Sequence, residues 1–534
     1  DPIVRVEARR LRSKLDKYYE GEGSRDEILI GLPKGGYAAV FGARETHKKQ
    51  PFRASTPSTI VVLPFSNLST GGDSEYFSDG LTQELIHGLT RVQGLRVVAW
   101  TSAAQLRGAS CDVQAIGQQL SVAAVLTGSV RRAGSRVRIA VQLIDTASNY
   151  YLWSEVYDRE LDDLLQIQDE ISRAIVSALR ITLADHLPPP VPPKRPFDFE
   201  AHNLYLRGRV EWNKRTATGL PLSVNYFEQA IARDANFALA WAGLADAYTL
   251  LGEYTLLPPD EALPKAKRAA LRAVELDPSR GEAWASLALI GTIFEWDWAT
   301  AEAHYIRAIE LNPGYATVHM WFGTDHLANM GRFDEAYREI ELSRHMDPWS
   351  PMNIGSQGFM HMLARQYDAA LQIYGKALEL DRNFYKVWTL LGRALIQKGD
   401  YDEAVRTLEK GRALGGAIPN VLGALGQAHA LAGRPERARA LMEELKVLSR
   451  QWYVPATCYA MVHLGLGEKN LALEALEAGC ERREFSMVGL AVHPAYDCLR
   501  DEPRYRAMVH RMGLDSALEA AGRSWSFPFS APAV

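Results

Sequence analysis

Small apolar residues recur through the second half of the chain with a regular spacing. Seven successive alanines are separated by 34 or 35 residues, and a small residue follows seven positions after most of them. The alanines are Ala266, Ala301, Ala336, Ala370, Ala404, Ala438 and Ala472. Residues three, four or seven positions apart share one face of a helix, so small side chains there let helices approach closely. The spacing predicts repeated pairs of helices over residues 199–480.

Proline and glycine mark the ends and the contacts of these predicted helices. Pro278, Pro313 and Pro348 each follow a marker alanine by twelve residues, where proline ends a helix. Bulky residues precede a glycine in the first helices, as in Trp388-Thr-Leu-Leu-Gly392. With these features the segment resembles the tetratricopeptide repeat (TPR) family, with its W…LG…Y…A…F…A…P pattern. The resemblance implies an α-α superhelix of about eight repeats, with capping helices and a tail at 481–534.

The segment 58–186, before the repeats, has the alternation typical of an α/β domain. The apolar runs TIVVLPF and LRVVAW predict buried strands, with an amphipathic helix between them. The stretch AAVLTGSVRRAGSRVRIAVQLIDTASNYYLWSEVYD contains three strand-length runs joined by turn residues, so it predicts a β-meander. This order predicts a mixed sheet with helices against it. The proline-rich stretch 187–198 favours polyproline II and is expected to link this domain to the repeats.

Several blocks of this α/β segment resemble a known family. The blocks are VVLPFSNLS, YFSDGLTQELIHGLTRVQGLRVVAWTS and VLTGSVRRAGSRVRIAVQLIDTASNYYLWSEVYDRELDDLLQIQDEI. They are similar to the TolB-type amino-terminal domain of bacterial multidomain regulators. In that family the domain commonly precedes TPR arrays and follows either a class III adenylate cyclase domain or a DNA-binding domain. The resemblance implies the architecture and says little about the activity of this domain.

The first 42 residues combine a predicted basic helix with a predicted β-hairpin. DPIVRVEARRLRSKLDKYYE has helical spacing, and ILIGL and YAAVF are strand runs joined by the turn PKGG. VRVEARRLRSKL…ILIGLPKGGYAAVF resembles the recognition helix and wing of the OmpR-type winged-helix domain, and 43–57 is expected to be a linker. The resemblance implies a partial winged helix that binds DNA in the complete parent protein. Its expected DNA-binding residues are Arg5, Arg9, Arg10, Arg12 and, on the wing, Lys34.

Length, charge and cysteine use limit the class of protein. A chain of 534 residues is too long for one core, and its net charge of −4 restricts any nucleic-acid role to a local patch. We find no run of 18 or more apolar residues, so we expect no membrane span. The four cysteines stand far apart, which is typical of reduced thiols in a cytoplasmic protein. Because the chain starts at Asp1 and not at Met, we expect it to be a fragment of a longer protein.

No sequence motif in the chain indicates catalysis. GLPKGG lacks the GxxxxGK[ST] spacing of a phosphate-binding loop, and no HExxH, cysteine–histidine cluster, EF-hand loop or GxSxG elbow occurs. His319 and His326 are seven residues apart on a predicted helix, where packing explains them better than a metal does. We therefore expect no catalytic residue, no cofactor and no metal site.

The concave face of the predicted solenoid is the expected partner site. TPR arrays bind peptides or helices along their first helices, where the candidate residues are Asn353, Lys386, Arg393 and Asn420. Lys386 and Arg393 would suit an acidic or carboxylate-ended peptide. The sequence thus favours a non-catalytic cytoplasmic regulator, in particular a transcription regulator. Two alternatives stay open: a TPR scaffold without a DNA role, and the non-catalytic tail of an adenylate-cyclase-type signalling protein.

Overall fold

A short antiparallel strand pair is the described part of the first of two structural units. The structure is a computed structural model that describes residues 14, 18, 28–31, 40–43, 59–69, 74–108, 112–160, 164–179 and 198–520. The units are residues 1–57 and 58–534. In the first unit, β1 (Ile28–Gly31) pairs with β2 (Val40–Ala43) in the two runs that the sequence predicts to be strands. The five expected DNA-binding residues, most of the 187–198 linker and the tail after residue 520 lie outside the described residues.

The second unit begins with a six-stranded mixed sheet. Its order is β5-β3-β6-β7-β8, with β4 beside β6; β3 runs parallel to β5 and β6, and β6, β7 and β8 are antiparallel. The predicted mixed sheet with a β-meander is therefore confirmed. The strands are β3 (Thr59–Val62), β4 (Ser66–Asn67), β5 (Arg96–Val97), β6 (Ala124–Ala133), β7 (Arg136–Asp145) and β8 (Tyr151–Glu160). The helices are α2 (Ser74–Thr90), α3 (Trp100–Ala103), the 3₁₀ turn η2 (Ala104–Leu106), α4 (Val113–Leu120) and α5 (Leu164–Ala178).

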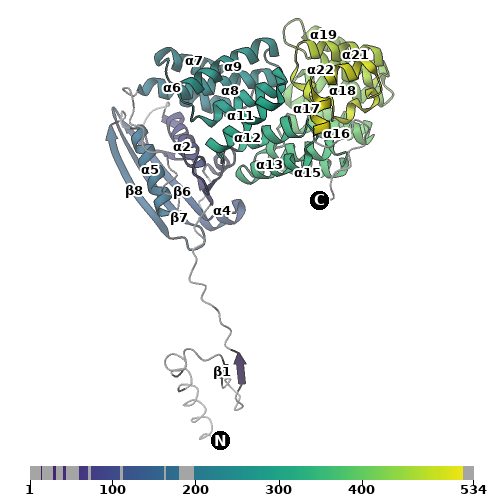
Figure 1. Ribbon diagram of the computed structural model, residues 1–534. Helices are drawn as coiled ribbons and strands as arrows, with labels where there is room; N and C mark the ends of the chain where they lie inside the picture. Colours follow the sequence, from purple (N-terminus) through teal and green to yellow (C-terminus); the bar gives the residue numbers. More distant parts are fainter. Residues whose placement is uncertain are drawn as a thin grey trace. The chain divides into compact units, whose positions relative to one another are not determined.

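Side-chain alternation explains which face of this sheet is covered. On β7, Val137 and Ile139 are buried, whereas Arg136 and Arg138 on the opposite face are exposed and both pair with Asp158 of β8. The central strand β3 is apolar at every buried position because it lies between two parallel neighbours. Helix α2 packs against both α5 and the first helix of the solenoid (Figure 1).

Helices α6 to α21 form eight successive pairs between residues 199 and 481 of the described chain (Figure 1). The pairs are α6 (Phe199–Asn213) with α7 (Gly219–Arg233), α8 (Ala238–Glu253) with α9 (Pro259–Leu276), α10 (Gly281–Ile290) with α11 (Trp298–Leu311), α12 (Ala316–Trp321) with α13 (Phe333–Met346), α14 (Pro351–Leu363) with α15 (Tyr367–Leu380), α16 (Tyr385–Lys398) with α17 (Tyr401–Gly415), α18 (Pro419–Leu431) with α19 (Pro435–Leu448), and α20 (Ala456–Gly465) with α21 (Lys469–Glu481). The π-helical turns η5 (Gly291–Glu295) and η6 (Phe322–Leu327) extend α10 and α12. The predicted fold class, a mostly helical TPR solenoid preceded by a mixed sheet, is confirmed.

The repeated small residues lie where helices touch. All seven marker alanines are completely buried. A Cβ on Gly358 would stand 2.6 Å from the ring of Tyr374, and one on Gly392 would stand 2.4 Å from the side chain of Leu408. Each glycine therefore allows a first helix to contact a large residue of its own second helix. The period in the sequence is the period of these contacts.

The C-terminal segment folds back onto earlier repeats. It consists of η7 (Phe485–Gly489), η8 (Pro494–Leu499), α22 (Pro503–Arg511) and α23 (Leu514–Ala520). The indole nitrogen of Trp298 donates to the carbonyl oxygen of Met512 at 2.7 Å, and the Arg365 guanidinium donates to that of Val492 at 2.9 Å. This segment is thus bonded to the middle of the solenoid as well as following its last pair.

Candidate binding site between the sheet domain and the solenoid

Three turn residues of the solenoid, spaced 35 residues apart, hold the sheet domain. We call residues 59–179 the sheet domain and residues 199–481 the solenoid. The guanidinium of Arg91 donates to the Ser279 carbonyl oxygen at 3.3 Å, and the Gly314 N–H donates to the Thr90 carbonyl oxygen at 3.0 Å. The side-chain amide of Gln105 donates to the carbonyl oxygen of Trp349 at 2.8 Å. Ser279, Gly314 and Trp349 each follow the proline that ends a second helix. Successive repeats therefore present equivalent turns to one edge of the sheet domain.

A buried hydroxyl–carboxyl pair lies at the centre of this contact. The Ser102 hydroxyl donates to Oδ1 of Asp347 at 2.5 Å and accepts from the N–H of Trp349 at 2.9 Å. The N–H of Ala99 donates to the carbonyl oxygen of Met346 at 2.7 Å. Ser102 is fully buried and Asp347 is 6% exposed. Burial raises the pKa of Asp347 to about 6, against the opposing hydrogen bond from Ser102.

Polar side chains of α2 continue the contact along the first helices of the solenoid. The Asn213 side-chain amide donates to Oε1 of Gln83 at 2.7 Å. Nε2 of His87 lies 3.3 Å from Oε1 of Glu282, and Glu282 also accepts from Asn312 at 2.7 Å. Burial lowers the pKa of His87 even though Glu282 opposes this effect, so the imidazole favours its neutral form.

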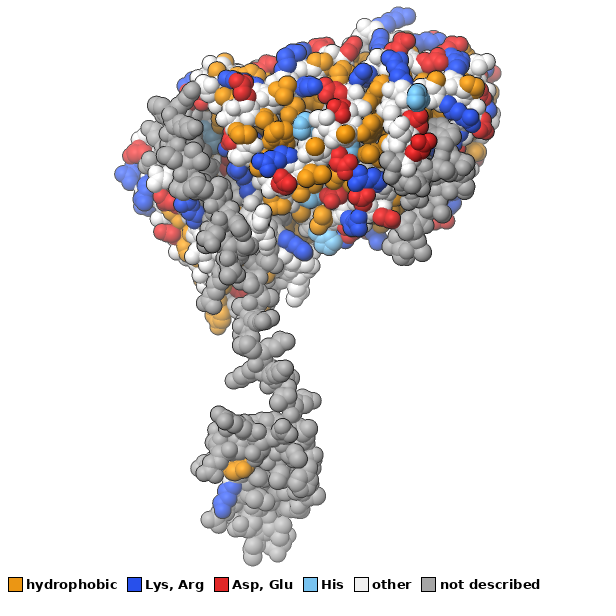
Figure 2. Space-filling model, viewed as in Figure 1, with side chains coloured by type: hydrophobic (Ala, Val, Ile, Leu, Met, Phe, Trp, Pro, Cys, Tyr) orange, Lys and Arg blue, Asp and Glu red, His pale blue; other side chains and the backbone are white. Residues whose placement is uncertain are grey.

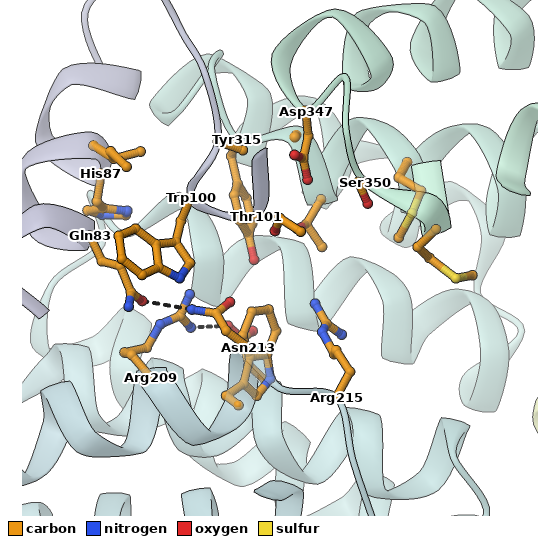
Figure 3. A pocket seen from close by; sticks show the side chains of 18 of the residues that line it. Gln83, His87, Trp100, Thr101, Arg209, Asn213, Arg215, Tyr315, Asp347 and Ser350 are labelled. Atoms are coloured by element: carbon orange, nitrogen blue, oxygen red, sulfur yellow. Dashed lines mark hydrogen bonds and ion pairs between the residues drawn. The ribbon is translucent and has the colours of Figure 1, made fainter. Parts of the chain in front are cut away.

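These contacts surround a cavity of about 560 Å³ between the two blocks (Figure 3). Its walls come from α2, from α3 and from first helices of the solenoid, including α6, α8, α12 and α14. The close-up shows Trp100 and Thr101 of the sheet domain, with Tyr315 of the solenoid between them, facing Arg209 and Arg215 across it (Figure 3). A volume of this size is within the usual range for small-molecule sites, which often lie between domains.

Two arginines of α6 and its following turn differ in how their charge is balanced. Nη1 of Arg209 lies 3.0 Å from Oδ2 of Asp246, whose other oxygen accepts from the Ser286 hydroxyl at 2.6 Å. Arg215 stacks on Trp212, with its Cζ 3.8 Å from the ring centroid, and makes no ion pair with any carboxylate of the described residues. The two guanidinium groups therefore both contact one indole, and within the described residues only that of Arg209 is neutralised by a carboxylate.

The expected partner-binding residues do not form one cluster. Asn353 is 5% exposed and lines the cavity, where its side chain donates to the carbonyl oxygen of Ser343. The Lys386 ammonium donates to Oε1 of Glu253 at 3.0 Å, an ion pair across the inner face of the solenoid. Arg393 lies on α16 and is half-buried. Asn420 lies at the start of α18 and accepts from the Cys458 thiol at 3.5 Å. Their role in binding a partner stays a prediction.

The two histidines that we considered as a pair have separate partners. His319 Nδ1 lies 2.6 Å from Oε2 of Glu339, and His326 Nδ1 lies 2.9 Å from the Thr292 hydroxyl. The described part of the chain contains no group of three or more His, Cys, Asp or Glu residues placed to hold a metal ion. None of the helices in the described ranges is long and apolar enough to cross a membrane.

The visible face of the solenoid has no patch of one charge. Acidic and basic side chains are interspersed over it, with apolar side chains between them (Figure 2). This distribution agrees with the small net charge of the chain, −4. The side chains that distinguish the cavity are Asp347, Trp212 and Arg215, and we did not identify them or Ser102, the partner of Asp347, in the sequence. The one available signal is an aromatic residue beside basic residues at the end of a helix, in EWNKR.

Comparison with family models identifies two parts of the chain. Residues 56–174 match the model described as HilA/YgeH-like transcriptional regulator, second domain. Residues 361–415 and 389–451 match two tetratricopeptide repeat models, which confirms the predicted TPR repeats. The TolB-type and OmpR-type resemblances of the sequence stay predictions.

Two curated relatives match parts of the chain. A protein of Rhizobium meliloti (strain 1021), provisionally named adenylate cyclase 3, is 35% identical over 233 residues, which are 43% of this chain and 40% of that protein. The transcriptional regulator HilA of Salmonella typhimurium is 22% identical over 306 residues, which are 56% of this chain and 52% of HilA. The chain therefore spans about half or less of the length of these relatives.

Two solved structures resemble the chain at low sequence identity. The structure of pilF from Pseudomonas aeruginosa is 21% identical and covers 45% of this chain and 98% of its own, with a TM-score of 0.32. A human IFIT1 dimer is 15% identical and covers 65% of this chain and 77% of its own, with a TM-score of 0.43. These scores are too low to extend the likeness further.

Proposed function

We propose that this chain is the regulatory part of a cytoplasmic transcription regulator and that it acts without catalysis. The observation that carries the proposal is the docking of a HilA-like regulator domain onto a TPR solenoid through buried polar contacts such as Ser102 with Asp347. The match to HilA over 306 residues also supports a role in transcription regulation. In the complete protein, Arg5, Arg9, Arg10, Arg12 and Lys34 would contact DNA.

The mechanism that we propose is a change in docking upon partner binding. TPR repeats bind proteins through their inner face, and here α2 is bonded to a first helix of that face and α3 to the turn that precedes α14. A protein partner that contacts the same first helices competes with the sheet domain. By thermodynamic linkage, such a partner shifts the equilibrium toward the undocked state. The size of the shift is the difference between its binding free energies for the undocked and the docked states. The sheet domain would then pass the change to the DNA-binding end.

A second candidate function is the non-catalytic tail of an adenylate-cyclase-type signalling protein. The observation that favours it is the 35% identity over 233 residues with the Rhizobium meliloti protein. Both functions use the docked sheet domain and solenoid in the same way. They differ in what the natural full-length protein does at its amino-terminal end, either selective DNA binding or conversion of ATP to cyclic AMP.

DNA binding by the natural full-length protein across a salt series tests the proposal. We expect sequence-selective binding that weakens steeply as salt rises, because lysine and arginine contacts release counterions from phosphates. The variant Arg9→Ala/Arg12→Ala should lose this selective binding. The matched control Lys48→Ala/Lys49→Ala removes the same charge from the 43–57 segment and should retain selectivity.

Two results decide against the regulator. Absence of selective DNA binding at low salt, together with Mg-dependent formation of cyclic AMP, would establish the signalling protein instead. Absence of both activities would leave a TPR scaffold, whose partner is then found by pull-down. Equal loss of selectivity in the control variant would show that general charge, and not the predicted helix, mediates the binding.

A further inference from the structure

The cavity between the sheet domain and the solenoid is closed by parts of both blocks. Its volume is about 560 Å³, and Trp100 and Thr101 face Arg215 across it (Figure 3). Helices α2 and α3 of the sheet domain line it together with first helices of the solenoid. A volume of this size suits a compact small molecule.

Several hydrogen-bond donors at this cavity have no acceptor within the described residues. Trp212 is 3% exposed, yet its Nε1–H has no partner. Nε2 of Gln83 is buried without a partner, although Oε1 of the same side chain accepts from Asn213. The Tyr315 hydroxyl is also buried without a partner. Buried donors are nearly always paired in folded proteins, so three at one cavity indicate a missing acceptor.

Arg215 adds a positive charge that no carboxylate of the described residues neutralises. Its guanidinium lies over the ring of Trp212, with Cζ 3.8 Å from the ring centroid. A guanidinium that stacks on an aromatic face can still donate through the N–H groups in its plane. Its φ of 52° lies in the left-handed region, just after the end of α6, where glycine or asparagine is usual. An arginine side chain is therefore placed here despite an unfavourable backbone conformation.

The acidic groups at the cavity are mostly engaged already. Asp246 is paired with Arg209, Glu253 with Lys386, and Asp347 accepts from Ser102. Glu282 accepts from Asn312. Glu84 makes no ion pair within the described residues, but it lies in the field of Arg280 and His87. Among the described residues, the groups without a partner are thus three hydrogen-bond donors, the cation Arg215 and the carboxylate of Glu84. The donors and Arg215 together suit an oxyanion of a ligand.

We propose that this cavity binds a small molecule through a carboxylate or phosphate group. The oxyanion is held by the Arg215 guanidinium and by Nε1–H of Trp212, and Nε2 of Gln83 donates from the sheet domain to a second polar atom of the molecule. Trp100 and Tyr315 contact the remainder of the molecule. Because its donors come from both blocks, the ligand strengthens their docking. This site does not depend on the proposed DNA role, since its occupancy is measured without DNA.

Calorimetric titration of the full chain with two probes, inorganic phosphate and succinate, tests the site. Each probe is titrated to about 20 mM, well above the roughly 1 mM dissociation constant expected for a single oxyanion contact. We expect saturable binding of one equivalent of at least one probe. Binding of phosphate alone indicates a phosphorylated ligand, and binding of succinate alone indicates a carboxylate.

Two variants and one control locate the binding. Arg215→Gln should weaken it at least tenfold, because a charge-assisted bidentate contact is lost. Trp212→Phe keeps the ring under Arg215 but removes the donor, and it should weaken binding about threefold to tenfold. Arg406→Gln removes an exposed arginine of α17 that pairs with Glu403, and it should bind as the wild type does.

The outcomes that overturn the site are direct. One is the absence of saturable binding of both probes to the wild type. Another is unchanged affinity in Arg215→Gln, which would place the binding elsewhere. Equal thermal midpoints of the wild type and Arg215→Gln without a probe establish that any loss of affinity is not a loss of folding.

Discussion

Replacing Asp347 with asparagine should remove a pH-dependent weakening of the contact between the sheet domain and the solenoid. Asp347 is 6% exposed, and burial raises its pKa to about 6. An aspartate in an unfolded chain has a pKa of about 3.9. The folded state therefore holds a proton that the unfolded state loses between about pH 4 and pH 6.

The sign and the size of the effect follow from this difference. A carboxyl whose pKa is raised on folding contributes its full stability below pH 4 and loses that contribution as the pH rises to 6. A shift of about two units corresponds to about 3 kcal/mol in the free energy of unfolding. Asparagine has no such titration, and the preceding repeat already carries Asn312 at the equivalent turn position, so its shape is compatible with the turn.

The assay is urea unfolding of the wild type and Asp347→Asn, followed by tryptophan fluorescence and repeated from pH 4 to pH 7. We expect the variant to gain about 3 kcal/mol relative to the wild type across this range, most of it before pH 6. Asp325, another buried carboxyl with a pKa raised to about 7, is present in both proteins and cancels in the difference. A difference that stays constant with pH, or that favours the wild type as pH rises, would refute the reasoning.

Two further predictions concern the same inner face. Gly314→Ala should weaken docking by about 1–3 kcal/mol, because its Cβ would stand 2.7 Å from the carbonyl oxygen of Thr90. Faster hydrogen exchange in α2 would report it, whereas the control Gly375→Ala, with no atom within 4 Å of its Cβ, should show no change. Lys386→Ala should destabilise the chain by about 3 kcal/mol, because it leaves Glu253 without its partner, and Lys386→Met/Glu253→Gln should recover most of that loss. If urea unfolding shows Lys386→Ala to be as stable as the wild type, that ion pair contributes nothing, and Lys386 is free for a partner.

The repeating part of the fold could be predicted because every repeat needs a small buried residue at the same helix contact. A marker alanine such as Ala370 is completely buried against the neighbouring helix, and the same requirement returns every 34 or 35 residues. The strands of the sheet domain could be predicted equally well, because Val137 and Ile139 alternate with exposed arginines along β7. These signals are local, so they need no knowledge of which distant residue lies opposite.

The site could not be predicted because its residues are paired across long separations. Ser102 and Asp347 are 245 residues apart, and Lys386 and Glu253 are 133 residues apart. Lys386 is basic and lies on a first helix, which is why the sequence favoured it as a partner-binding residue. No pattern within one repeat shows that its charge faces a carboxylate from another repeat.

The solenoid turns that contact the sheet domain nevertheless recur with the period of the repeat. This regular spacing explains how a solenoid can recognise a whole domain. The turns after three successive second helices place Ser279, Gly314 and Trp349 in a row, and each bonds to the sheet domain. The preceding proline is constant because it ends a helix, whereas the residue after it differs because it meets a different part of the sheet domain. In a solenoid each repeat contacts mainly its neighbours, so its pitch sets the distances along this row. A partner that binds the inner face and changes the pitch therefore alters all three contacts at once. Binding on the inner face can in this way release the sheet domain.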